Sequence, residues 1–178
     1  MIAILLNDAS FEQDIRELLM AFYPGETFTH KEEEAGEAEL IVRGVRDGNS
    51  FSLDVTPVKK EAVHFALIYP DFSNRFETKN EIKQTLYRLL SAQTGRELPW
   101  GTLTGIRPTK IALTKLYDGW TDEQIETYMR ETYFTSKEKI DLSIDVAERE
   151  RRLLSTIDYE NGYSLYVGIP FCPTTCLY

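Results

Sequence analysis

The chain has 178 residues, of which 42% are hydrophobic and 28% charged, and its formal net charge is −9. This length suits one domain with an extension or two small domains, and this composition is typical of a globular protein. The acidic balance argues against nucleic acid or an anionic membrane as the main partner. No apolar run reaches the roughly 20 residues of a membrane span, and the residues after Met1 lack the basic start of a signal peptide. We therefore expect a cytoplasmic protein.

The first 76 residues predict a small mixed α/β sheet region. The short apolar run Ile2 to Leu6 suits a buried strand. Ser10 with Gln13 forms a capping-box pattern that predicts the start of an amphipathic helix, which Pro24 ends.

A hairpin and a further strand are predicted downstream. Asp47-Gly48 is a tight-turn sequence between Glu39–Arg46 and an alternating apolar run from Phe51 to Val55. The β-branched and aromatic residues of Ala62–Tyr69 favour a strand over a helix turn. The acidic cluster is expected to be a solvated loop or edge rather than a metal site; it comprises Glu32, Glu33, Glu34, Glu37 and Glu39.

Residues 77–158 predict a helical region with four helices between about residues 79 and 155. Capping-box patterns at Thr78, Thr121 and Thr135 are expected to begin three of them, and Pro108 to lie in the first turn of the other. Gly95 is expected to end the first helix.

Isolated functional side chains before the C-terminal cysteines favour structural roles. His30 and His64 each stand alone, so packing is favoured over metal binding. Three arginines end the last predicted helix, where cations complement the helix dipole; they are Arg149, Arg151 and Arg152. The segment Trp100–Lys110, which reads WGTLTGIRPTK, lacks a phosphate-loop pattern. We interpret it as a connector whose Trp100 fills the gap between sheet and helices. An anion site is the alternative.

Both cysteines of the chain lie near its C-terminus, spaced C-x3-C after the apolar run Tyr163–Phe171, a predicted strand. A third cysteine at the next position would give C-x3-C-x2-C, whose three thiolates can hold a [4Fe-4S] cluster with one open iron. A disulfide between Cys172 and Cys176 is unexpected in a cytosolic chain, and zinc would need two further ligands.

The segment Tyr166–Tyr178, which reads YVGIPFCPTTCLY, together with Trp100–Lys110, resembles the oxygen-independent coproporphyrinogen III oxidase-like radical S-adenosylmethionine proteins, in particular their HemZ-type branch. The resemblance implies that Cys172 and Cys176 are cluster ligands. It also implies that Tyr166 and Tyr178 contact the cofactor S-adenosylmethionine. Many relatives have His where this chain has Gly168, a form typical of the HemZ-type branch.

For the whole protein, the resemblance implies one-electron reduction of S-adenosylmethionine by the cluster. The 5′-deoxyadenosyl radical that forms then takes a hydrogen atom from a propionate of a porphyrinogen substrate, and loss of carbon dioxide and one electron leaves a vinyl group, as part of haem biosynthesis. An electron donor for the cluster is the implied partner. The resemblance names no catalytic residue outside the cysteine loop.

The expected fold class is α+β: an N-terminal sheet region (1–76), a helical region (77–158) and the first strand of a truncated radical S-adenosylmethionine barrel (159–178). With two cysteines, the chain alone is expected to be inactive and its cluster unstable. The unpaired barrel strand is expected to be disordered, to fold back, or to pair with a second copy. Two alternatives stay open: a haem-trafficking relative, or a free-standing binding module formed by residues 1–155.

Overall fold

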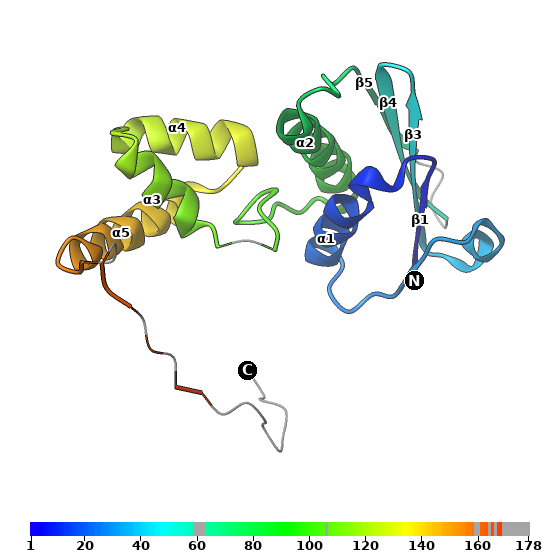
Figure 1. Cartoon of the computed structure of the whole chain (residues 1–178). Helices are drawn as coiled ribbons and strands as arrows, with labels where there is room; N and C mark the ends of the chain where they lie inside the picture. Colours follow the sequence, from blue (N-terminus) through cyan, green and yellow to red (C-terminus); the bar gives the residue numbers. More distant parts are fainter. Residues whose placement is uncertain (59–62, 106, 159–160, 164, 166, 169–178) are drawn as a thin grey trace.

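The computed structural model of the chain describes residues 1–58, 63–105, 107–158, 161–163, 165, 167 and 168. These residues form a sheet lobe and a helical lobe, joined by a linker that follows the second long helix (Figure 1). The predicted mixture of α and β structure, with a sheet first and helices after it, is confirmed.

The sheet has five strands in the order β2-β1-β3-β4-β5. β1 is parallel to β2 and β3, whereas β3, β4 and β5 are successively antiparallel, so the sheet is mixed. The strands are β1 (Ile2–Leu6), β2 (Phe28–Thr29), β3 (Leu40–Asp47), β4 (Ser50–Pro57) and β5 (His64–Ile68). The predicted hairpin is confirmed, with Asp47 paired to Ser50 and Gly48 at φ 56° in the turn.

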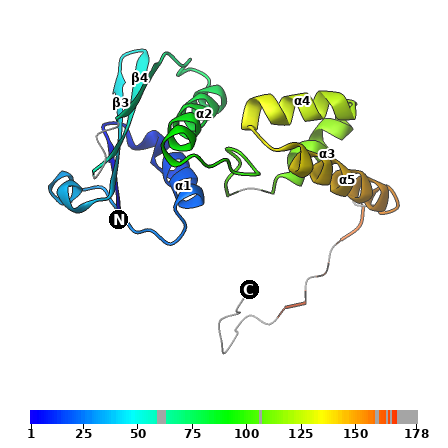
Figure 2. The same cartoon turned by 180° about the vertical axis from the view of Figure 1, so that it is seen from behind.

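Helices α1 (Glu12–Phe22) and α2 (Arg75–Thr94) both lie on one side of the sheet, as the two opposite views show (Figures 1 and 2). Their apolar faces bury a common core with the inward side chains of β1, β3 and β4. Buried and half-buried residues alternate along β4, because successive strand residues point to opposite faces of the sheet. The buried set faces the two helices. Helix α2 therefore shares its core with the sheet.

The predicted starts of these two helices were wrong. Asp8, rather than Ser10, accepts the capping hydrogen bond, and it begins the short 3-10 helix η1 (Ala9–Phe11) that leads into α1. Asn74 caps α2, while Thr78 lies fully buried inside that helix and donates to the carbonyl of Asp71. The predicted end of α2 is confirmed, because Gly95 adopts the left-handed conformation.

The acidic cluster forms a second 3-10 helix, η2 (Glu32–Glu37), rather than an irregular loop. Glu32, Glu33 and Glu37 are exposed and Glu34 is half-buried. Two of the carboxylates contact basic neighbours: Glu32 pairs with Arg43, and Glu34 pairs with Lys31 at 2.6 Å. Ala35 of this helix packs on Ala3, on the side of the sheet opposite the main core. The helix thus covers part of this second face of the sheet and keeps its carboxylates at the surface.

The helical lobe contains α3 (Thr109–Tyr117), α4 (Asp122–Tyr133) and α5 (Lys137–Leu154), which surround a second core. The capping box of Thr121 and Gln124 is confirmed. Ser136, rather than Thr135, occupies the N-cap position of α5. With α2, the four predicted helices are present between residues 75 and 154.

The segment predicted as a barrel strand is described at four positions, namely 163, 165, 167 and 168. None of these four belongs to a strand, and Tyr163, Leu165 and Val167 are largely exposed. The barrel strand therefore stays a prediction.

Among the described residues, no helix is long and apolar enough to cross a membrane.

Candidate functional site

The predicted cofactor residues, Cys172, Cys176, Tyr166 and Tyr178, all lie outside the described residues. Within the part of the chain that the structure describes, no group of three or more His, Cys, Asp or Glu side chains is placed to hold a metal ion. His30 instead approaches the carbonyl of Ile4 and the carboxylate of Glu12. Thiolates are the ligand type of iron–sulfur clusters, so the two cysteines remain the residues that fit such a group.

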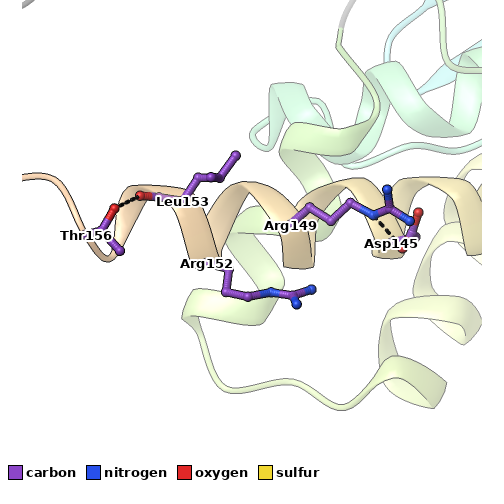
Figure 3. Close-up of a pocket in the computed structure, with 5 residues that line it drawn as sticks. All are labelled: Asp145, Arg149, Arg152, Leu153 and Thr156. Carbon is purple, nitrogen blue, oxygen red and sulfur yellow. Dashed lines mark hydrogen bonds and ion pairs between the residues drawn. The ribbon is translucent and has the colours of Figure 1, made fainter.

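A hollow of about 690 Å³ lies along the C-terminal half of α5 (Figure 3). Its described lining comes from this helix and its end: Asp145, Arg149, Arg152, Leu153 and Thr156. Arg149 pairs with Asp145 at 3.0 Å on the helix surface, an i, i+4 pair of the kind that stabilises exposed helices. Side chains from a single helix do not converge on a ligand, so the described lining of this hollow does not form a site.

A second hollow, of about 400 Å³, lies where the linker crosses α1 and α2; we call it the Lys83 pocket. α1 contributes Asp14 and Glu17, and α2 contributes Lys79, Asn80 and Lys83. The remaining lining is Phe76, Thr102, Leu103, Thr104, Gly105, Ile111 and Tyr133. The pocket therefore brings together side chains from both lobes and from the linker.

Lys83 is the most unusual side chain of this pocket, because only 6% of its surface is exposed. Its Nζ atom donates to the hydroxyl of Thr104 at 2.7 Å. Removal from water lowers the pKa of Lys83, and the nearby charges of Asp14 and Glu17 oppose that change. An ammonium group has three donors, so the Thr104 bond leaves two without a described protein partner.

The two carboxylates of the pocket differ in their surroundings. Glu17 accepts hydrogen bonds from Gln13 at 2.9 Å and from Thr104 at 3.1 Å, and these bonds, the first above all, lower its pKa. Asp14 has its pKa raised by desolvation, which the positive charges of Lys79 and Lys83 only partly offset. Lys79 Nζ lies 4.0 Å from Asp14 Oδ1, too far for a hydrogen bond.

Asn80 adds a polar group without a partner. It is nine-tenths buried, and its side-chain amide makes no hydrogen bond to any described residue. The described polar atoms that are fully enclosed without a partner belong to Glu12, Ser91 and Thr135, so the amide of Asn80 still reaches solvent. Here the amide lines the pocket, where a bound molecule can satisfy it.

The linker Trp100–Lys110 takes its course from two glycines. Gly101 and Gly105 have φ values of 57° and 67°, in the left-handed region that favours glycine. At Gly101 a Cβ atom would lie 1.9 Å from the carbonyl oxygen of Tyr133, the same oxygen that accepts from the amide of Thr102 at 2.7 Å. The glycine therefore allows the linker to contact the end of α4 directly.

Both sequence interpretations of this segment were incomplete. It is a connector, but Trp100 packs on the core of the helical lobe rather than between sheet and helices. Farther along, Arg107 pairs with Glu150 of α5 and does not line the pocket. The polar residues that the sequence prediction missed are Asp14, Asn80 and Lys83. Their helical spacing offered one signal, because Asn80 and Lys83 share a helix face with the buried Tyr87.

Comparison with known proteins gives one match. The oxygen-independent coproporphyrinogen-III oxidase-like protein HemZ of Bacillus subtilis (strain 168) is 35% identical over 127 residues, which cover 69% of this chain and 25% of that protein. The chain thus spans about a quarter of the length of this curated relative. No family profile and no solved structure matches it. The resemblance to a HemZ-type protein that the sequence predicted is confirmed: the chain is similar to an oxygen-independent coproporphyrinogen-III oxidase-like protein HemZ over 69% of its length.

Proposed function

We propose that the whole protein is a radical S-adenosylmethionine enzyme of haem biosynthesis that converts propionate side chains of a coproporphyrinogen into vinyl groups. The observation that supports this proposal is the 35% identity to a coproporphyrinogen-III oxidase-like protein over 127 residues. The cysteine loop is consistent with it, since soft thiolate ligands suit iron–sulfur clusters. Residues 1–158 would be the region that precedes the cofactor loop.

In this proposal Cys172 and Cys176 hold a [4Fe-4S] cluster, and Tyr166 and Tyr178 contact S-adenosylmethionine. The cluster, when bound, supplies the electron that the cleavage of S-adenosylmethionine requires. The 178 residues contain two cysteines, one fewer than the three thiolates of such a site. We therefore expect these residues by themselves to hold no stable cluster and to show no turnover.

The test uses the full-length protein with its cluster reconstituted under anaerobic conditions. Incubation with a reductant, S-adenosylmethionine and coproporphyrinogen III should yield protoporphyrinogen and carbon dioxide. Cys172→Ser and Cys176→Ser should each lose iron, acid-labile sulfide and turnover, whereas Thr175→Ser, a conservative change in the same loop, should keep all three. The comparison separates loss of a ligand from general disturbance of the loop.

Two results would contradict the proposal in different ways. Full iron and sulfide content in both cysteine variants would show that these residues are not ligands. A loaded, reduced wild-type protein that forms no protoporphyrinogen would contradict the reaction, and transfer of haem to an acceptor protein by the same preparation would favour the haem-trafficking alternative.

A further inference from the structure

The Lys83 pocket contains charges that no described group neutralises at hydrogen-bond distance. Lys83 forms no ion pair with any described residue, and its one hydrogen bond goes to the neutral hydroxyl of Thr104. The nearest cation reported for Asp14 is Lys79, at 4.0 Å. Buried charges are normally paired, because an unpaired charge removed from water is costly. The charges of the pocket thus act on one another at a distance, but neither Lys83 nor Asp14 makes a charge-assisted hydrogen bond to a described side chain of opposite charge.

The signs of the lining groups decide which ligand fits. Lys79 and Lys83 supply two positive charges, and Asp14 and Glu17 supply two negative ones. A simple anion would meet both carboxylates, and a simple cation would meet both ammonium groups. A molecule that carries one carboxylate and one ammonium group can place each of them against the opposite charge.

The rest of the lining suits a small apolar group. Leu103 is buried, Ile111 is half-buried, and Phe76 is 52% exposed. The volume of about 400 Å³ lies toward the lower end of small-molecule sites. The unpaired amide of Asn80 can both donate to and accept from the ligand's polar groups.

We propose that the Lys83 pocket is a binding site for a small zwitterion of the α-amino acid class with an apolar side chain. Lys83 donates to the ligand's carboxylate, and the carboxylate of Asp14 accepts from its ammonium group. Asn80 hydrogen-bonds to the same polar end, and Leu103 and Ile111 contact the side chain. This proposal does not depend on the reaction that the cysteine loop supports.

The experiment is isothermal titration calorimetry of the full-length protein, prepared without its cluster, with L-leucine and L-phenylalanine as probes. Leucinamide lacks the carboxylate and 4-methylpentanoate lacks the ammonium group, so both analogues should bind at least tenfold more weakly than leucine. These two arms need no variant and remain informative if a substitution disturbs folding. Equal affinity for 4-methylpentanoate would indicate an anion site and would overturn the proposal.

Variants then locate the binding. Lys83→Met keeps a long side chain of similar volume, and Asp14→Asn keeps the shape of the carboxylate. Each removes one charge-assisted hydrogen bond, so each should weaken leucine binding about tenfold to a hundredfold. Lys110→Met is the matched control, because Lys110 is exposed, lies in the first turn of α3 at the end of the linker and does not line the pocket. No heat from either amino acid, or unchanged affinity in Lys83→Met, would refute the site.

Discussion

Replacing Gly101 with alanine should destabilise the protein far more than the same change at Gly119. Both glycines have positive φ, 57° and 81°, so alanine pays a backbone cost of roughly 1–2 kcal/mol at either position. At Gly119 the added Cβ atom meets nothing within 4 Å. At Gly101 it would lie 1.9 Å from the carbonyl oxygen of Tyr133 and 2.6 Å from that of Phe134. Backbone atoms cannot rotate away as a side chain can.

The linker must then withdraw from the end of α4. Withdrawal breaks the bond from the Thr102 amide to Tyr133, worth about 0.5–1.5 kcal/mol net, and adds an overpacking cost of about 1–3 kcal/mol. We expect a loss in the free energy of unfolding of roughly 2.5–6.5 kcal/mol for Gly101→Ala and about 1–2 kcal/mol for Gly119→Ala. Urea denaturation followed by far-UV circular dichroism measures both. Equal losses would refute the close contact between linker and α4.

Two further changes test the helix caps and the acid side of the stability curve. Thr121→Ala removes a capping box and should lower the free energy of unfolding by about 1 kcal/mol. Thr135→Val removes a buried hydroxyl without a described partner and should leave the free energy of unfolding unchanged. Equal urea midpoints for the two variants would contradict the assigned caps. Hydrogen bonds from Ser10, followed by the one from Arg46, hold the pKa of Asp8 at about 2, below its ordinary value of 3.8. The stabilisation from this carboxylate should be present above about pH 4 and lost as the pH falls toward 2. Asp8→Asn should therefore lower stability by about 1 kcal/mol at neutral pH, and the difference from the wild type should shrink as the pH falls from 4 through 2; a difference that stays constant over that range would contradict this pKa.

The sequence predicts the elements of this fold better than their starting residues. Hydrophobic periodicity and turn glycines fix the hairpin at Asp47-Gly48 and the end of α2 at Gly95, because these signals are local. The predicted starting residues were wrong where two residues that can act as N-caps lie close together in the sequence, as Asn74 and Thr78 do. Tertiary packing decides between them: the hydroxyl of Thr78 is buried against the carbonyl of Asp71, so it is unavailable as a cap.

The Lys83 pocket could not be predicted from local sequence patterns. A lysine on a helix is ordinarily a surface residue, and the position of Lys83 on the same helix face as Tyr87 is the one signal of its burial within α2. Its burial comes from Thr104, which lies 21 residues away along the chain and also contacts Glu17, 87 residues from it. Contacts of this range follow from the path of the linker, and the turns at its two glycines determine that path.

The two motifs that carry the resemblance to the HemZ-type proteins therefore have different physical roles. In Trp100–Lys110, Gly101 permits contact with α4, Thr104 bonds to Lys83, and Arg107 pairs with Glu150 of α5. Each of these contacts joins elements or lines the pocket, and none requires an iron–sulfur cluster. Similarity in this segment is thus accounted for by the junction between the lobes. The proposed radical chemistry depends instead on the thiolates of Cys172 and Cys176, so a variant of the linker should change folding or pocket binding without removing a cluster ligand.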